Sequence, residues 1–164
     1  MNAHPTIRAA GPSDIPLILA FIRELAAYEK LAHQVVATDE GLRETLFGRV
    51  PRAEVLIAEV DGAAAGFALF FHNYSTFLGQ PGIFLEDLFV RPESRGRGVG
   101  RALLARLAAI ARERGCGRLE WAVLDWNLDA IGFYRRIGAT PMSEWTTFRL
   151  TGEALAQLAV ERPD

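Results

Sequence analysis

The sequence predicts an α/β fold in which a mixed sheet is flanked by helices. Two strand patterns follow one another at residues 54–60 and 63–72, and Asp61-Gly62 between them is typical of a two-residue hairpin turn. Further along, strand patterns alternate with helical ones, as expected where helices cover a sheet. The 164 residues, 50% of them hydrophobic, fit a single domain spanning residues 1–164.

The individual elements are read from periodicity and from turn and cap residues. Strands are expected at residues 6–10, 54–60, 63–72, 82–90, 118–124 and 144–150, with a loop at 73–82. A first helix follows the cap Ser13-Asp14 and ends at Tyr28-Glu29. Further helices are expected at residues 38–48, 101–114, 127–138 and 151–160. The helix around residues 101–114 has the expected buried stripe Val99, Leu103, Leu107 and Ile110.

The run Arg95-Gly96-Arg97-Gly98-Val99-Gly100 lies between an expected strand and an expected helix. Glycines let the backbone close on an anion, and the N–H groups at the start of a helix attract phosphate. The run lacks the lysine of a P-loop and the glycine spacing of a dinucleotide-binding turn. Its arginines favour a more heavily charged anion. The alternative is an exposed basic turn without a ligand.

Composition excludes several classes of protein. A net charge of −2 argues against bulk binding of nucleic acid. No apolar run approaches the roughly 20 residues of a membrane span. The histidines His4, His33 and His72 are scattered, so no metal site is expected. With Cys116 as the single cysteine and no secretory pattern at the N-terminus, we expect a cytoplasmic protein.

Three polar positions are candidates for chemistry. Glu86 and Asp87 interrupt an apolar strand, and in a regular strand they would point to opposite faces, so that only one need face a reaction centre. A solvated edge pair is the alternative. Tyr134 lies on the inward side of its helix with Ala130, seven residues after Asn127. Taken alone, Tyr134 is typical of a core tyrosine, and Asn127 of a helix cap.

These segments resemble the GCN5-related N-acetyltransferases, the GNAT superfamily. Residues 95–100 match the signature Gln/Arg-x-x-Gly-x-Gly/Ala. Within the superfamily the chain is most similar to the diamine (spermidine/spermine) acetyltransferases. This similarity lies in residues 24–29, 85–90, 126–127 and 133–139, and overall it runs from about residue 7 to 150. It implies the GNAT acyl-CoA N-acyltransferase fold, with a central, mostly antiparallel sheet whose strands 4 and 5 are splayed apart, and a homodimer.

The resemblance also implies the cofactor and the catalytic roles. Acetyl-coenzyme A would be the acetyl donor, without a metal. Glu86 would be a water-linked base, Asp87 would hold the substrate amine, and Tyr134 would be the general acid. A backbone N–H near Leu88, beside a bulge, would polarise the thioester carbonyl. The residues implied to bind acetyl-coenzyme A are Leu88, Phe89, Val90, Arg95, Gly96, Arg97, Gly98, Val99, Gly100, Arg101, Asn127, Ala130 and Tyr134.

The acceptor is expected to be a small primary amine, bound in an acidic groove. The residues expected to line this groove are Tyr28, Glu29, Glu86, Asp87, Glu144 and Trp145. Trp145 would stack on the alkyl chain or on the cation, although Glu29 alone is typical of a solvated helix end. Residues 141–145 are shorter and less acidic than the same stretch of the eukaryotic polyamine enzymes, which leaves a diamine or a lysine-like amino acid as open as a polyamine.

The sequence also bears on how the acetyl group is transferred and on two alternative functions. No serine or cysteine has a matching base, so direct transfer in a ternary complex is expected. A catalytically silent acyl-coenzyme A sensor and a peptide or protein N-acetyltransferase are the alternatives. Retention of both Glu86 and Tyr134 argues against the sensor.

Overall fold

The structure, a computed structural model, describes residues 4–161. Their contacts group into two compact units, one ending at Ala122 and one beginning at Val123. The strands are β1 (Thr6–Ala9), β2 (Glu54–Val60), β3 (Ala63–Ser75), β4 (Gln80–Val90) and β5 (Leu119–Trp121). The α-helices are α1 (Ile15–Tyr28), α2 (Asp39–Phe47), α3 (Val99–Glu113), α4 (Leu128–Arg136) and α5 (Gly152–Val160). The short 3-10 helices are η1 (Pro12–Asp14), η2 (Ala32–Gln34) and η3 (Pro92–Ser94).

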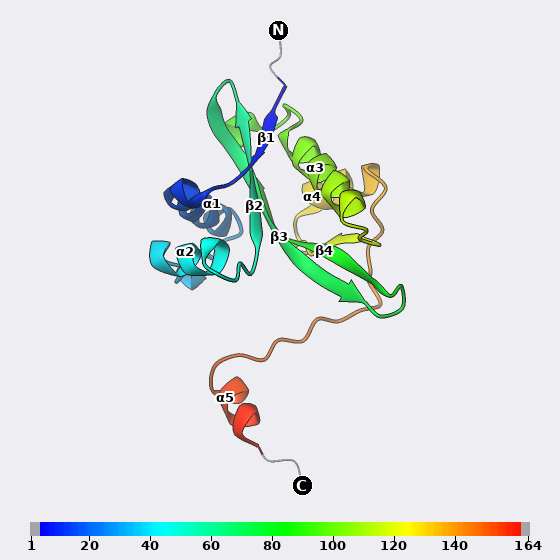
Figure 1. The fold of residues 1–164 in the computed structure, drawn as a ribbon. Coiled ribbons are helices and arrows are strands. Elements are labelled where there is room, and N and C mark those ends of the chain that lie inside the picture. The colour runs from blue at the N-terminus through cyan, green and yellow to red at the C-terminus, as the bar shows by residue number, and fades with distance from the viewer. Residues whose placement is uncertain (1–3, 162–164) are drawn as a thin grey trace. The chain divides into compact units, whose positions relative to one another are not determined.

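The first unit contains a mixed sheet of five strands in the order β1-β2-β3-β4-β5. All neighbours pair antiparallel except β4 and β5, which are parallel. Helices α1 and α2 cover one face of this sheet and α3 covers the other (Figure 1). The expected α/β fold with a mostly antiparallel sheet is therefore confirmed.

The core between α1 and the sheet contains three aromatic rings. Phe21 of α1 stacks on Phe67 of β3, with ring centroids 5.2 Å apart, and meets Phe89 of β4 edge-on at 6.3 Å. All three side chains are buried. Phe67 and Phe89 are directly paired on neighbouring strands, so they share the face of the sheet that α1 covers. On the other face, the expected stripe Val99, Leu103, Leu107 and Ile110 of α3 is buried as well.

The β2–β3 turn confirms the hairpin expected at Asp61-Gly62. Both residues have positive φ, 54° and 78°, as the two central residues of a type I′ turn require. The next hairpin is longer than expected, since β3 continues to Ser75 and β4 begins at Gln80. The expected loop at residues 73–82 was therefore too long. Pairing such as Asn73 with Gly82 extends the ladder into a polar, glycine-containing stretch that propensity alone disfavours.

The strand expected at residues 144–150 is absent from the described chain. These residues form a turn and an unpaired segment, with Trp145 73% and Phe148 91% exposed. The expectation was wrong for this chain in isolation, because a strand pattern becomes a strand only where a neighbour supplies backbone hydrogen bonds. Helix α5 follows it, also without a buried residue. None of the described helices is both long and apolar enough to cross a membrane.

Candidate active site

Strand β4 contains a bulge at Glu86. Leu69 pairs with Asp87 and Phe70 pairs with Leu85, so Glu86 has no partner residue on β3. An extra residue in one strand of an antiparallel pair bends that strand and re-aims the side chains that follow. The bulge that the family resemblance implies is therefore present, two residues before Leu88.

The bulge places Asp87 on the α1 face of the sheet. Directly opposed residues share a face, and Asp87 is in one row with Leu69 and Val55, which belongs to the core around α1. Leu85 is in the row of Phe70, whose ring lies 6.0 Å from the Arg114 guanidinium at the end of α3. In a regular strand Leu85 and Asp87 would share a face. The strand is therefore not regular here, and the alternation that would place Glu86 and Asp87 on opposite faces of a regular strand does not apply.

Asp87, Glu86 and Glu29 form a group of carboxylates on this side of the sheet. Burial, and then the charges of Glu86 and Glu29, raise the pKa of Asp87 to about 6. Burial also raises the pKa of Glu29. All of these effects oppose negative charge at Asp87, so a bound cation would relieve them. The structure thus brings together three of the expected substrate-binding residues.

The end of α1 positions Tyr28 and Glu29. The Leu31 N–H donates to the Ala26 carbonyl at 2.7 Å and the Lys30 N–H donates to the Ala27 carbonyl at 3.1 Å. With Lys30 at φ 62°, this is a Schellman motif that closes the helix. Glu29 is consequently held at the C-cap and half-buried, rather than being a fully solvated helix end.

The C-terminal half of β4 has an open edge. Strand β5 pairs with β4 only from Ile83 to Leu85, which confirms that strands 4 and 5 part. The Arg91 N–H donates to Ala65 on β3 at 2.9 Å. By alternation along an antiparallel strand, Val90 and Leu88 direct their N–H and C=O groups away from β3, to the open edge. The Leu88 N–H is therefore placed as a hydrogen-bond donor at this open edge, one residue after Asp87.

The α3 N-terminus lies just beyond this edge and offers further donors. Gly98 is its N-cap with φ 78°, and no side chain caps it within the described residues. The Ala102 N–H donates to the Gly98 carbonyl at 2.9 Å, so the N–H groups of Val99, Gly100 and Arg101 precede the first helical bond. A Cβ atom on Gly96 or Gly98 would meet open space, whereas their positive φ favours glycine. This end of the helix is suited to an anion.

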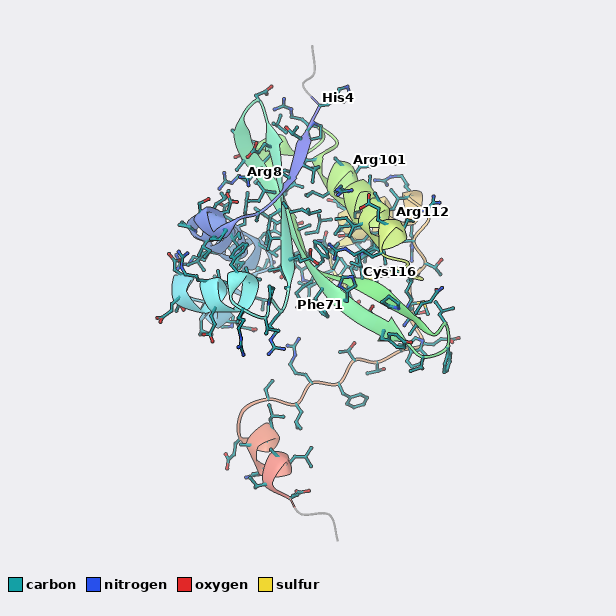
Figure 2. All side chains as sticks on the ribbon, in the orientation of Figure 1. His4, Arg8, Phe71, Arg101, Arg112 and Cys116 are labelled. Carbon is teal, nitrogen blue, oxygen red and sulfur yellow. The ribbon has the colours of Figure 1, made fainter. Side chains whose placement is uncertain are left out.

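The three arginines of this loop have different surroundings. The Arg97 guanidinium pairs with Asp61 of the β2–β3 turn at 2.8 Å. The Arg95 guanidinium lies 4.8 Å from the centre of the Tyr28 ring, and its Nε donates to the Val90 carbonyl at 3.0 Å. Arg101 is exposed in the first turn of α3 (Figure 2). The expected cofactor residues Phe89 and Val99 are buried, so their side chains face the core.

A further arginine, Arg91, joins β4 to α1, and this contact was not expected from the sequence. It forms two hydrogen bonds to the Glu24 carboxylate, at 2.8 and 2.9 Å, and donates to the Ala64 carbonyl at 3.1 Å. Its guanidinium also lies 4.7 Å from the centre of the Phe21 ring. Glu24 stands one turn before Tyr28, and this contact fixes the substrate-side helix to the strand. No periodicity in the sequence indicates it.

The second unit carries the remaining expected site residues. Asn127 caps α4, and its side-chain oxygen accepts from the Ala130 N–H at 3.3 Å, which confirms the cap. Tyr134 is partly buried on α4, its ring centre 5.5 Å from that of Phe133. Glu144 and Trp145 are exposed. No cluster of three metal-ligating side chains occurs among residues 4–161.

These features can be compared with known proteins. The family model described as the acetyltransferase (GNAT) family matches residues 21–139, which include the bulge, the open edge and the α3 N-terminus. The chain belongs to the GNAT family. It is accordingly an acetyl-coenzyme A-dependent N-acetyltransferase, as expected from the sequence.

Curated relatives of this GNAT chain include three acetyltransferases. The bovine thialysine N-epsilon-acetyltransferase is 42% identical, over 93% of this chain and 96% of its own length. The L-ornithine N5-acetyltransferase of Arabidopsis thaliana is 36% identical, over 91% of this chain and 85% of its own. The human spermidine/spermine N(1)-acetyltransferase-like protein 1 is 34% identical over 94% of this chain, but only 24% of its own length. The proximity to the polyamine acetyltransferase subfamily is thereby confirmed.

A solved structure agrees with this assignment. An integron cassette protein from the mobile metagenome of V. cholerae superposes with a TM-score of 0.80 at 26% identity. The match covers 96% of this GNAT chain and 98% of the cassette protein. The fold thus extends over nearly the whole sequence.

Proposed function

We propose that this protein transfers the acetyl group of acetyl-coenzyme A directly to the primary amine of a small aliphatic substrate, a lysine-like amino acid or a diamine. The observation that carries the proposal is the carboxylate group on the α1 face. Burial of Asp87 and the charges of Glu86 and Glu29 disfavour negative charge at Asp87, as its raised pKa reflects. An alkylammonium substrate compensates such a site. The relatives named for thialysine and for L-ornithine, both with an amine at the end of a side chain, support this class.

The donor side of the site suits acetyl-coenzyme A. Its phosphates would be held by the N–H groups at the start of α3, by the turns at Gly96 and Gly98 and by Arg101. The open edge at Leu88 and Val90 offers groups that pair with amides, as an added strand does. Acetyl-coenzyme A supplies the activated acetyl thioester. Asn127 and Ala130, the other expected contacts, stand at the start of α4.

The catalytic roles follow from the chemistry of amine acetylation. An ammonium of pKa about 10.4 must lose its proton before it attacks. We assign the proton-accepting role to Glu86, through water, while Asp87 and Glu29 hold the amine. The Leu88 N–H stabilises charge on the thioester oxygen, and Tyr134 returns a proton to the leaving thiolate. Because the acceptor attacks the thioester directly, the two substrates form a ternary complex with the enzyme.

The proposal includes a homodimer in the cytoplasm. The C-terminal segment, residues 145–160, exposes six large apolar side chains. They are Trp145, Phe148, Leu150, Leu155, Leu158 and Val160. A nine-residue helix with no buried residue is marginal in water, and a second copy would cover it. Sedimentation at several concentrations tests this, and a monomer at every concentration contradicts it.

The test of the substrate class is consumption of acetyl-coenzyme A with one amine at a time. The series comprises lysine analogues, diamines, polyamines, aminoglycosides and peptides. We expect turnover with the lysine analogues and diamines. Turnover confined to peptide N-termini would favour the peptide acetyltransferase, and binding of acetyl-coenzyme A without any turnover would favour the silent sensor. Acetylated protein formed with acetyl-coenzyme A alone would contradict direct transfer.

A further inference from the structure

We propose that Arg95 is a positioning residue that couples the donor-binding loop to the acceptor-binding end of α1, and is not a ligand of the coenzyme phosphates. This rests on the proposed function, since it assigns the two sides of the site to donor and acceptor. The sequence signature alone assigns Arg95 to the cofactor. The contacts of its side chain lead elsewhere.

The Arg95 guanidinium is engaged on the acceptor side. It lies over the Tyr28 ring, 4.8 Å from its centre, and 6.0 Å from the centre of the Phe89 ring. Tyr28 immediately precedes Glu29, a member of the carboxylate group. Cation–π contacts of this geometry hold a flexible arginine in one place. The loop that carries the anion-binding glycines is thereby fixed to the helix end that carries the acceptor residues.

The same side chain also marks the end of the open edge of β4. Its Nε donates to the Val90 carbonyl at 3.0 Å. That carbonyl faces the open edge, because the neighbouring Arg91 N–H bonds to β3. The Arg95 side chain therefore connects three parts of the site: its own loop, the last carbonyl of the open edge, and Tyr28.

The anion site has other sources of positive charge. The N–H groups at the start of α3 are uncapped, and Arg101 forms no ion pair among the residues that the structure describes. Arg97 is held by Asp61. Arg95 is thus not needed as the phosphate partner, and turning it to a phosphate would break both its stacking on Tyr28 and its hydrogen bond to Val90.

The test separates the two contacts of Arg95 by substitution. Arg95→Gln keeps a nitrogen at the position of Nε, which can donate to Val90, but removes the guanidinium that stacks on Tyr28. Tyr28→Phe keeps the ring and Tyr28→Leu removes it. Arg23→Gln is the matched control, because Arg23 is an exposed arginine on α1, the helix that also carries Tyr28. Each variant, and the Arg95→Gln/Tyr28→Leu pair, is compared by amine KM, acetyl-coenzyme A Kd and unfolding free energy.

We expect Arg95→Gln and Tyr28→Leu each to raise the amine KM about fivefold, the order of a partly exposed cation–π contact. The double variant should be no worse than either single one. Tyr28→Phe should raise the amine KM less than Tyr28→Leu, because it keeps the ring, and Arg23→Gln should resemble the wild type. The acetyl-coenzyme A Kd should change less than twofold. The unfolding free energies of the two single variants should be non-additive in the pair.

Other outcomes overturn the proposal. Arg95 is a phosphate ligand if Arg95→Gln loses about tenfold in acetyl-coenzyme A affinity at an unchanged amine KM, and if this difference from the wild type shrinks as salt is added. Additive unfolding free energies show that the two side chains do not act together. The unfolding measurements need no substrate, so they test the contact between Arg95 and Tyr28 even if no amine is acetylated. Absence of acetylation with every amine would contradict the proposed function instead.

Discussion

Glu29 at the C-cap of α1 and Asp87 on β4 lie close enough for the Glu29 carboxylate to raise the pKa of Asp87. They are 58 residues apart in the sequence (87 − 29), and two local devices bring them together. The Schellman motif stops α1 at Glu29, and the bulge at Glu86 turns Asp87 to the α1 face. The acceptor side of the site is therefore made by the points at which a helix ends and a strand ladder is interrupted.

Asp87→Asn should stabilise the protein at neutral pH. The pKa of Asp87 is raised from 3.8 to about 6, so its native carboxyl binds a proton more tightly than the unfolded one. The contribution of Asp87 to the free energy of unfolding is full below pH 4, and about 3 kcal/mol of it is lost as the pH rises through 6. Urea unfolding between pH 4 and 8 should show this decline in the wild type but not in the variant. The exposed Asp125→Asn should retain the decline, and equal profiles for the wild type and Asp87→Asn would contradict the burial of this charge.

Glu86→Gln and Asp87→Asn should affect different kinetic constants. If Glu86 accepts the proton, Glu86→Gln lowers kcat by roughly 10²-fold or more while the amine KM changes little. If Asp87 holds the ammonium, Asp87→Asn chiefly raises the amine KM. Initial rates over a range of amine concentrations at saturating acetyl-coenzyme A measure both constants. A collapse of kcat in Asp87→Asn, with Glu86→Gln nearly unchanged, would move the base to Asp87.

Tyr134→Phe should retain binding and lose turnover. The substitution removes only the hydroxyl, so the packing of the ring beside Phe133 is kept. Without a proton donor for the thiolate we expect a fall in kcat of about 10²-fold or more, with an unchanged Kd for acetyl-coenzyme A. Stopped-assay rates and calorimetric binding provide the two readings. Full activity in this variant would remove Tyr134 from the mechanism.

Gly98→Ala should weaken the donor side of the site. A Cβ at Gly98 meets open space, but φ 78° costs an L-residue about 1–2 kcal/mol. Relaxing that turn would displace N–H groups whose hydrogen bonds to a charged ligand are worth roughly 1.5–3 kcal/mol each, so we expect acetyl-coenzyme A affinity to fall about tenfold. Gly11→Ala is the control, since Gly11 also has open space and φ −118°. Equal affinity in both variants would separate this turn from the coenzyme.

The elements that the sequence predicts well are those with strong local signals. The apolar stripe of α3, the Asp61-Gly62 turn and the cap at Asn127 each depend on residues near one another in the chain, and each is confirmed. The signature at residues 95–100 also locates the α3 N-terminus correctly. Such features follow from periodicity and from backbone angles that few residues adopt.

What the sequence does not predict depends on distant partners. The pattern at residues 144–150 is that of a strand, yet no described strand pairs with it. The bulge at Glu86 is defined only against the register of β3, so it was expected from the family resemblance and not from any local pattern. The contacts of Arg91 with Glu24 and of Arg95 with Tyr28 join segments 67 residues apart, for which local spacing contains no signal.

A competition in one vessel tests the proposed acceptor class. Limiting acetyl-coenzyme A is offered to equal concentrations of a lysine analogue, a diamine and a peptide with a free N-terminus, and the acetylated products are quantified by mass spectrometry. We expect the acetyl group on the terminal side-chain amine of the lysine analogue or on the diamine. Acetyl groups found only on the peptide N-terminus would contradict it.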